Sequence, residues 1–88
     1  INLGEEIVNV RLLPNIFSYI AVLQSSIPLK YATLNIYNSN GKLVRQETEL
    51  SGNSVIFQRG KLSGGLYIFS LMQNNRILKI DKFSIIDY

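Results

Sequence analysis

Apolar and polar residues alternate along most of the chain with a period of two, as in the run Tyr67, Phe69 and Leu71. Such alternation places apolar side chains on one face of a β-strand, whereas the helical period of 3.6 does not dominate any segment. The pattern predicts about seven strands, near residues 5–13, 17–24, 31–37, 42–48, 54–58, 66–73 and 76–86.

Turn-forming residues separate these segments at intervals of about 8 to 12 residues, which is the spacing of a β-sandwich or barrel. The turns are predicted at Pro14-Asn15, Ser25-Ser26-Ile27-Pro28, Asn38-Ser39-Asn40-Gly41, Ser51-Gly52-Asn53, Gly60, Gly64-Gly65 and Asn74-Asn75. Because the strands are short and the chain is small, we expect an all-β fold with two packed antiparallel layers.

Two of the turns predict hairpins. Asn40-Gly41 permits the positive φ that a tight hairpin turn requires at both positions, so residues 31–37 should pair antiparallel with residues 42–48. Asn74-Asn75 should join the last two strands in the same way. These residues are interpreted as structural and are assigned no chemistry.

The last predicted strand contains a conflict of parity. Leu78 and Ile80 share one parity, whereas Phe83 and Ile85 have the other. A β-bulge near Asp81-Lys82 would resolve the conflict. Alternatively, the strand is covered on one face early and on the other face late, which leaves Lys79 and Lys82 outward as protection against edge-to-edge association.

Composition adds bounds on the class of protein. The 88 residues, 47% of them hydrophobic and 17% charged, predict one packed domain over residues 1–88. No apolar stretch reaches the roughly 18 to 20 residues that cross a bilayer, so no membrane insertion is expected. The chain lacks an initiator Met and a signal-like start, and we interpret it as a piece of a longer precursor.

The net charge of +3 comes from basic residues that are spread along the chain. A nucleic-acid module would show a dense basic stripe with exposed aromatic residues, so no nucleic-acid partner is predicted. The absence of Cys excludes disulfides, although it does not fix the compartment.

Catalytic and metal chemistry is poorly represented. The chain has no His and no Cys, which excludes imidazole bases, thiolate nucleophiles and the usual zinc ligands. Glu47 and Glu49 would share a strand face and offer Ca²⁺ ligands, but a solvated strand end is the commoner reading. Gly64-Gly65 precedes a strand rather than a helix, so it lacks a phosphate-binding helix N-terminus. We expect no catalytic residue, no metal site and no cofactor.

Tyrosines leave one alternative function open. An immunoglobulin-like adhesion or carbohydrate-binding module of a surface protein would use exposed aromatic rings as a stacking platform. The five candidates for such a platform are Tyr19, Tyr31, Tyr37, Tyr67 and Tyr88.

Four short motifs occur in a specific order. They are Pro14-Asn15, then Ile36-Tyr37-Asn38-Ser39-Asn40-Gly41-Lys42-Leu43-Val44, then Leu62-Ser63-Gly64-Gly65-Leu66-Tyr67, then Lys82-Phe83. In this order the chain resembles, over about residues 8 to 87, the C-terminal sorting domain of the type IX secretion system of Gram-negative bacteria, or Por secretion domain. Family members have a second proline where this chain has Ile16, and basic residues where it ends in Ile86-Asp87-Tyr88.

The resemblance implies an immunoglobulin-like sandwich of about seven strands that acts as a non-catalytic signal at the C-terminus of a cargo protein. It implies that the domain waits in the periplasm, is recognised by the outer-membrane translocon and its shuttle, and reaches the cell surface or the medium. It also implies that a sortase-like protease removes the domain afterwards.

Two sets of residues are assigned roles on this basis. The final strand is the candidate for partner recognition, through Lys79, Lys82, Phe83 and Ile85, although these residues would equally well just close the sandwich. The family motifs are expected to build the scaffold, with Gly65 at positive φ and with the Tyr67 ring buried and its hydroxyl bonded to nearby backbone. The scaffold set is Pro14, Asn15, Asn38, Gly41, Leu62, Gly65 and Tyr67.

Overall fold

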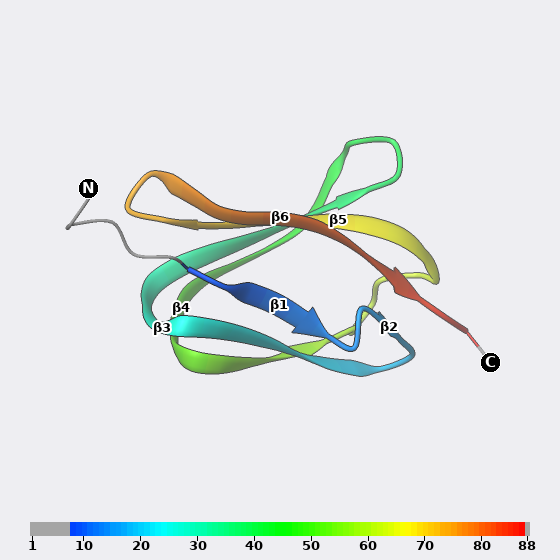
Figure 1. Cartoon of the computed structure of the whole chain (residues 1–88). Coiled ribbons are helices and arrows are strands. Elements are labelled where there is room, and N and C mark those ends of the chain that lie inside the picture. Colours follow the sequence, from blue (N-terminus) through cyan, green and yellow to red (C-terminus); the bar gives the residue numbers. More distant parts are fainter. Residues whose placement is uncertain (1–7, 88) are drawn as a thin grey trace.

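The computed structural model describes residues 8–87, and within them it contains six β-strands and no helix (Figure 1). The strands are β1 (Val10–Leu13), β2 (Ile16–Phe17), β3 (Ile20–Asn38), β4 (Leu43–Gln58), β5 (Gly65–Gln73) and β6 (Arg76–Ile85). Their order is β1-β3-β5-β6-β2, and β4 pairs with the other edge of β3. All pairings are antiparallel except that of β2 with β6. The predicted all-β, immunoglobulin-like sandwich is confirmed, with six strands instead of seven.

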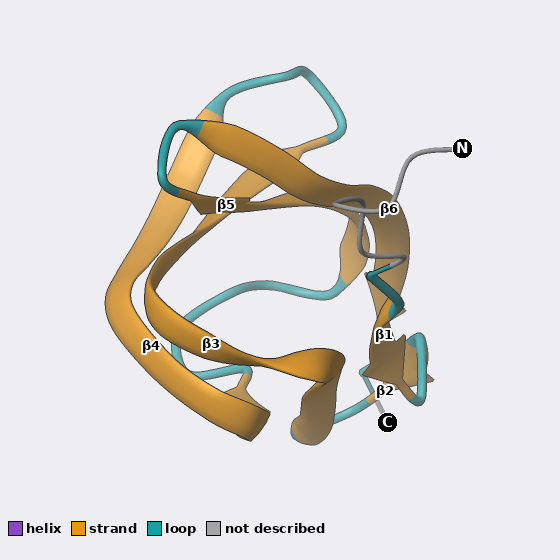
Figure 2. Cartoon of the chain, turned by 60° about the vertical axis from the view of Figure 1, so that its left-hand side comes forward, coloured by secondary structure: helices purple, strands orange, loops and turns teal. Residues whose placement is uncertain are grey.

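A long β3–β4 ribbon runs through both layers of the sandwich (Figure 2). The first half of β3 pairs with β1, and its second half pairs with β5, so the ribbon passes from one layer to the other. Two long strands thus replace four predicted ones: β3 covers most of the predicted strand 17–24 and all of 31–37, and β4 covers most of 42–48 and all of 54–58. The part of the first predicted strand that covers residues 5–7 lies outside the described residues.

Two predicted turns are therefore wrong as chain reversals. Residues 25–28 and 51–53 lie inside β3 and β4, where the pairing register shifts between Gln24 and Leu29. Glu49 and Gly52 adopt positive φ values of 59° and 96° on the opposite strand. Turn-forming residues here bend the ribbon while it keeps its partner, because bulges admit irregular backbone without ending a ladder.

Both predicted hairpins are confirmed. Gly41 has a φ of 81° and donates its N–H to the Asn38 C=O at 2.9 Å, whereas Asn40 does not adopt positive φ, so that part of the predicted turn geometry is wrong. The Asn38 side-chain oxygen accepts from the backbone N–H groups of Asn40 and Lys42, at 3.0 Å each. Asn74 and Asn75 have φ values of 53° and 62° and join β5 to β6. Left-handed backbone is thus supplied where a tight turn needs it.

The bulge in β6 lies at Leu78, so its predicted position near Asp81-Lys82 is wrong. Leu71 pairs with Lys79, and the next residue, Met72, pairs with Ile77. Leu78 is therefore the extra residue, and it lies before Ile80 and Phe83, whose parities conflict. Phe83 and Ile85 face the core, whereas Asp81, of the same parity, is exposed and Ile80 is left 58% exposed on the outer face.

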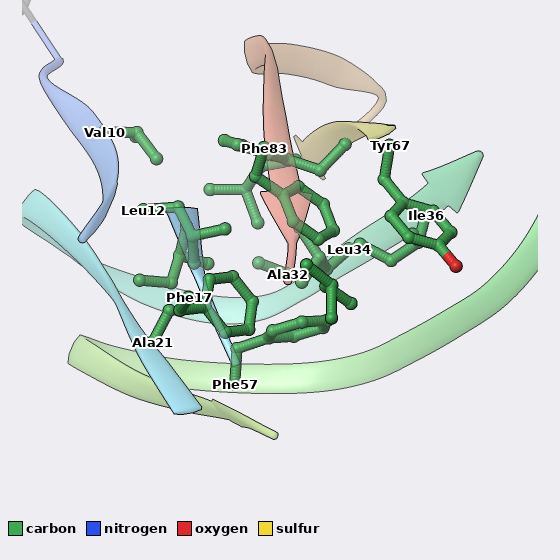
Figure 3. Packing of buried hydrophobic residues seen from close by; sticks show 14 of the residues in the cluster. Val10, Leu12, Phe17, Ala21, Ala32, Leu34, Ile36, Phe57, Tyr67 and Phe83 are labelled. Carbon is green, nitrogen blue, oxygen red and sulfur yellow. The ribbon is translucent and has the colours of Figure 1, made fainter. Parts of the chain in front are cut away.

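Aromatic rings fill the centre of the core between the layers (Figure 3). The Phe83 ring lies 5.7 Å from that of Phe17, 5.6 Å from that of Phe57 and 5.4 Å from that of Tyr67. These residues come from β2, β4, β5 and β6, so one cluster joins both layers. Offset or edge-to-face pairs at such distances add to the stabilisation from apolar burial.

Candidate functional site

The Leu-Ser-x-Gly-x-Tyr motif forms a closed corner where the chain enters β5. The Tyr67 ring is 5% exposed, and its hydroxyl donates to the Ser63 C=O at 2.5 Å. Gly65 has a φ of 149°, and Leu62 packs against the core. The predicted buried ring, its bond to nearby backbone and the positive φ are confirmed. The motif thus fixes how β5 is placed against the layers.

Arg59 holds the preceding loop together. Its Nε donates to the Leu62 C=O at 2.7 Å, and its Nη1 donates to the Ser18 C=O at 3.3 Å. Its Nη2 forms an ion pair with the Asp87 carboxylate, which ties the end of the described chain to this loop. Sequence reasoning missed this role, because an isolated Arg carries no motif and its three partners are far apart in the chain.

Gly64 lies directly beneath the Asp87 side chain. A Cβ atom at position 64 would stand 2.5 Å from Asp87 Oδ2 and 3.3 Å from the Ile85 C=O. A side chain at position 64 would therefore require the Asp87 carboxylate, which pairs with Arg59, to shift. The corner and the C-terminal segment are packed as one unit.

Pro14 and Asn15 carry the chain from one layer to the other. β1 pairs with β3, whereas β2, two residues later, pairs with β6. The Leu13-Pro14 peptide bond is cis. The Asn15 C=O accepts from the Ser84 N–H at 2.9 Å, so the motif also anchors the final strand.

The four predicted recognition residues of β6 fall into two groups. Phe83 and Ile85 are 1% and 3% exposed and belong to the core, so they do not form a surface in the folded domain. Lys82 is exposed and Lys79 is half-buried. Direct contact with a partner is therefore open to the lysines, while the two apolar residues hold the strand in place.

Lys82 lies on an outward face that is largely apolar. It pairs with Ile68 of β5, which is 41% exposed, and Ile80 is 58% exposed two residues earlier on the same face. Leu66 of β5, 50% exposed, continues the same face. We call Leu66, Ile68, Ile80 and Lys82 the β5–β6 outer face. Exposed apolar groups gathered around a charged one are typical of protein contact surfaces.

Three of the four acidic side chains of residues 8–87 contact neighbouring residues, and Asp87 pairs with Arg59 as described above. The Glu47 carboxylate pairs with Arg45 at 2.6 Å, so it is not free for Ca²⁺. Asp81 accepts from the Lys82 backbone N–H at 2.8 Å. In this part of the chain no group of three potential ligands could hold a metal ion, and no helix is long and apolar enough to cross a bilayer.

The proposed platform of five tyrosines is not formed. Tyr67 is in the core, and Tyr88 lies outside the described residues. Tyr19 and Tyr31 are 70% and 78% exposed, and Tyr37 is half-buried. The set therefore does not offer a shared stacking surface for a sugar.

Comparison with known proteins gives one match. A family described as secretion system C-terminal sorting domain matches residues 7–86 of the 88-residue chain. No curated protein matches. The matched span contains all four motifs, including the corner at Tyr67 and the Lys82-Phe83 pair.

Proposed function

This chain belongs to the family of secretion system C-terminal sorting domains and is a sorting signal for type IX secretion, and on that premise we propose how the signal is read. The family match over residues 7–86 carries the function, because it covers nearly the whole chain and includes every motif described above. The family is not known for catalysis. The domain therefore serves as a label with a fixed shape.

The proposed partners are the type IX translocon and its shuttle, with a cargo domain upstream in the precursor. Residues 1–88 act as a single domain that passes through the periplasm of a Gram-negative bacterium on the way to the cell surface or the medium. A sortase-like protease then removes the label. Family membership supports these steps, since a sorting signal needs a reader and is dispensable after delivery.

The β5–β6 outer face is proposed as the surface that the machinery contacts. Lys82 supplies a cation, while Ile68 and Ile80 supply exposed apolar area around it. A partner with an apolar surface and a carboxylate opposite Lys82 would complement this face. Phe83 and Ile85 contribute from beneath, because their burial holds β6 against the core.

Strand addition along β6 is less well supported than contact with its side chains. The Lys82 N–H already donates to the Asp81 carboxylate, so an incoming strand would have to displace that bond. Lys79 lies on the same strand and is half-buried, which leaves its ammonium as a secondary contact.

The sorting function is tested by fusing residues 1–88 to a periplasmic fluorescent protein and scoring fluorescence at the cell surface. Delivery should require both the domain and the translocon. A fusion that stays in the periplasm of cells with a working translocon would contradict the function.

The contact surface is tested in the same fusion with Lys82→Glu. Lys42→Glu, in the hairpin that joins β3 to β4, is the matched control because Lys42 is also exposed. Lys82→Glu should reduce surface delivery without lowering the melting temperature, and Lys42→Glu should leave delivery unchanged. Equal delivery of both variants would reject the β5–β6 outer face as the contact surface while leaving the sorting function intact.

A further inference from the structure

Four strands leave a backbone edge unpaired within residues 8–87: β1, β2, β4 and the part of β6 before Ser84. An unpaired edge is a template for another strand, and proteins block it with charges, bulges or a cover. The edge of β1 carries Arg11 at its middle, and the edge of β6 carries Asp81 and Lys82. The edges of β1 and β6 are therefore protected by charge, and that of β2 is only two residues long.

The two halves of β4 differ in this respect. Residues 43–53 carry the charged residues Arg45, Glu47 and Glu49, and the backbone has positive φ at Glu49 and Gly52. Residues 54–58, with the sequence Ser-Val-Ile-Phe-Gln, carry no charge and no positive φ. β4 is the outer strand of the ribbon, and β3 is its partner (Figure 2). This segment lacks the protection that the rest of the strand has.

The pairing with β3 determines which backbone N–H and C=O groups of residues 54–58 point to the open edge. The Arg59 N–H donates to the Tyr19 C=O at 2.8 Å, and the register continues with Phe57 opposite Ala21. Residues of one parity in an antiparallel ladder bond to the same neighbour, so the odd-numbered residues bond to β3. The N–H and C=O groups that point to the open edge belong to Ser54, Ile56 and Gln58.

An apolar row on the outer face reaches this edge. Ile56 is 64% exposed and pairs with Val22, which in turn pairs with Leu13 of β1. Leu13 is 40% exposed. Three apolar side chains therefore cross three strands and end at Ile56, in the middle of the uncharged segment.

We propose that residues 54–58 pair antiparallel with the same segment of a second copy of this chain, around a two-fold axis at Ile56. In this register Ile56 faces its own copy, and Ser54 faces Gln58 of the other chain. All six outward N–H and C=O groups of each copy then have partners, and no like charges meet. The apolar row continues across both copies, and a six-stranded sheet forms in the order β1-β3-β4-β4-β3-β1.

A second copy fits this edge because it presents the same uncharged segment and the same exposed Ile56, so apolar side chains meet at the axis and no like charges face each other. Such an isologous contact closes on itself and does not propagate into a fibre. The proposal concerns a different surface from the β5–β6 outer face. Its failure would leave the sorting function untouched.

The mass of the 88-residue chain in solution tests the proposal. Light scattering and sedimentation from micromolar to millimolar concentration should show a monomer–dimer equilibrium. Ile56→Lys should weaken the dimer by more than about tenfold, since two like charges would face each other at the axis. Ile80→Lys is the matched control, because Ile80 is 58% exposed on β6, and it should leave the equilibrium unchanged.

Complementary charges provide a second test of the register. Ile56→Lys and Ile56→Glu should each be monomeric alone and should associate when mixed, while Ile56→Thr keeps β-branching and should weaken the dimer. Melting curves establish that each variant is folded. A monomeric wild-type chain, a dimer indifferent to Ile56→Lys, or folded charge variants that fail to associate would overturn the proposal. Binding of an unrelated apolar strand peptide by a monomeric wild-type chain would overturn it too.

Discussion

Removal of the Tyr67 side chain should strongly destabilise the domain. The ring is 5% exposed and stacks on Phe83 at 5.4 Å, so Tyr67→Ala removes a buried aromatic group from the centre of the core. Such truncations cost about 3 to 5 kcal/mol. A small domain has a free energy of unfolding near the low end of the usual range of about 5 to 15 kcal/mol. The variant should therefore be partly unfolded at growth temperature.

Tyr67→Phe separates the hydroxyl from the ring. It keeps the stacking on Phe83 and removes the bond to the Ser63 C=O together with the longer contact of 3.4 Å with the Ser63 hydroxyl. The loss of one hydrogen bond should lower the free energy of unfolding by about 1 kcal/mol. In a domain of this size, that corresponds to a fall of about 4 to 8 °C in melting temperature.

Urea and thermal unfolding followed by circular dichroism measure both variants, and Tyr31→Phe is the matched control because Tyr31 is 78% exposed. The control should melt like the wild type. The reasoning about the corner would be refuted if Tyr67→Phe also melted like the wild type, and the reasoning about burial would be refuted if Tyr67→Ala lost less than about 1 kcal/mol.

Two further substitutions test the turns. Gly64→Ala should lower the free energy of unfolding by about 1 to 3 kcal/mol through its clash with Asp87, and Asp87→Ala in the same chain should recover part of that loss; additive effects in thermal melts would show that the two sites do not touch. Gly41→Ala should cost about 1 to 2 kcal/mol because Gly41 has a φ of 81°, whereas Gly41→Asn, which tolerates that backbone better, should cost less; equal melting temperatures for the two variants would contradict the role assigned to φ.

The hairpins could be predicted from sequence because their chemistry is local. Gly41 and the pair Asn74-Asn75 supply left-handed backbone within a few residues of the reversal. The continuity of β3 and β4 could not be predicted. Residues 25–28 and 51–53 have turn composition, and that composition is equally compatible with a reversal and with a bend that keeps the same partner strand.

The candidate site was predicted in part for the same reason. The corner at Tyr67 is closed by Ser63, four residues away, so both partners lie within one short sequence motif. The Arg59–Asp87 ion pair depends on a meeting of distant segments, which no local pattern reports. Phe83 lies opposite Tyr67 and the bulge at Leu78 lies opposite Leu71 and Met72, so both are relations between β5 and β6 that the sequence of β6 alone does not report.

Accessibility of a reporter to protease added outside the cell tests the central claim most directly. A periplasmic reporter fused to residues 1–88 should become accessible to the protease in cells with a working type IX translocon and stay protected in cells without it. The unfused reporter should stay protected in both. Equal protection of the fused reporter in the two strains would contradict the conclusion that this chain is a type IX sorting signal.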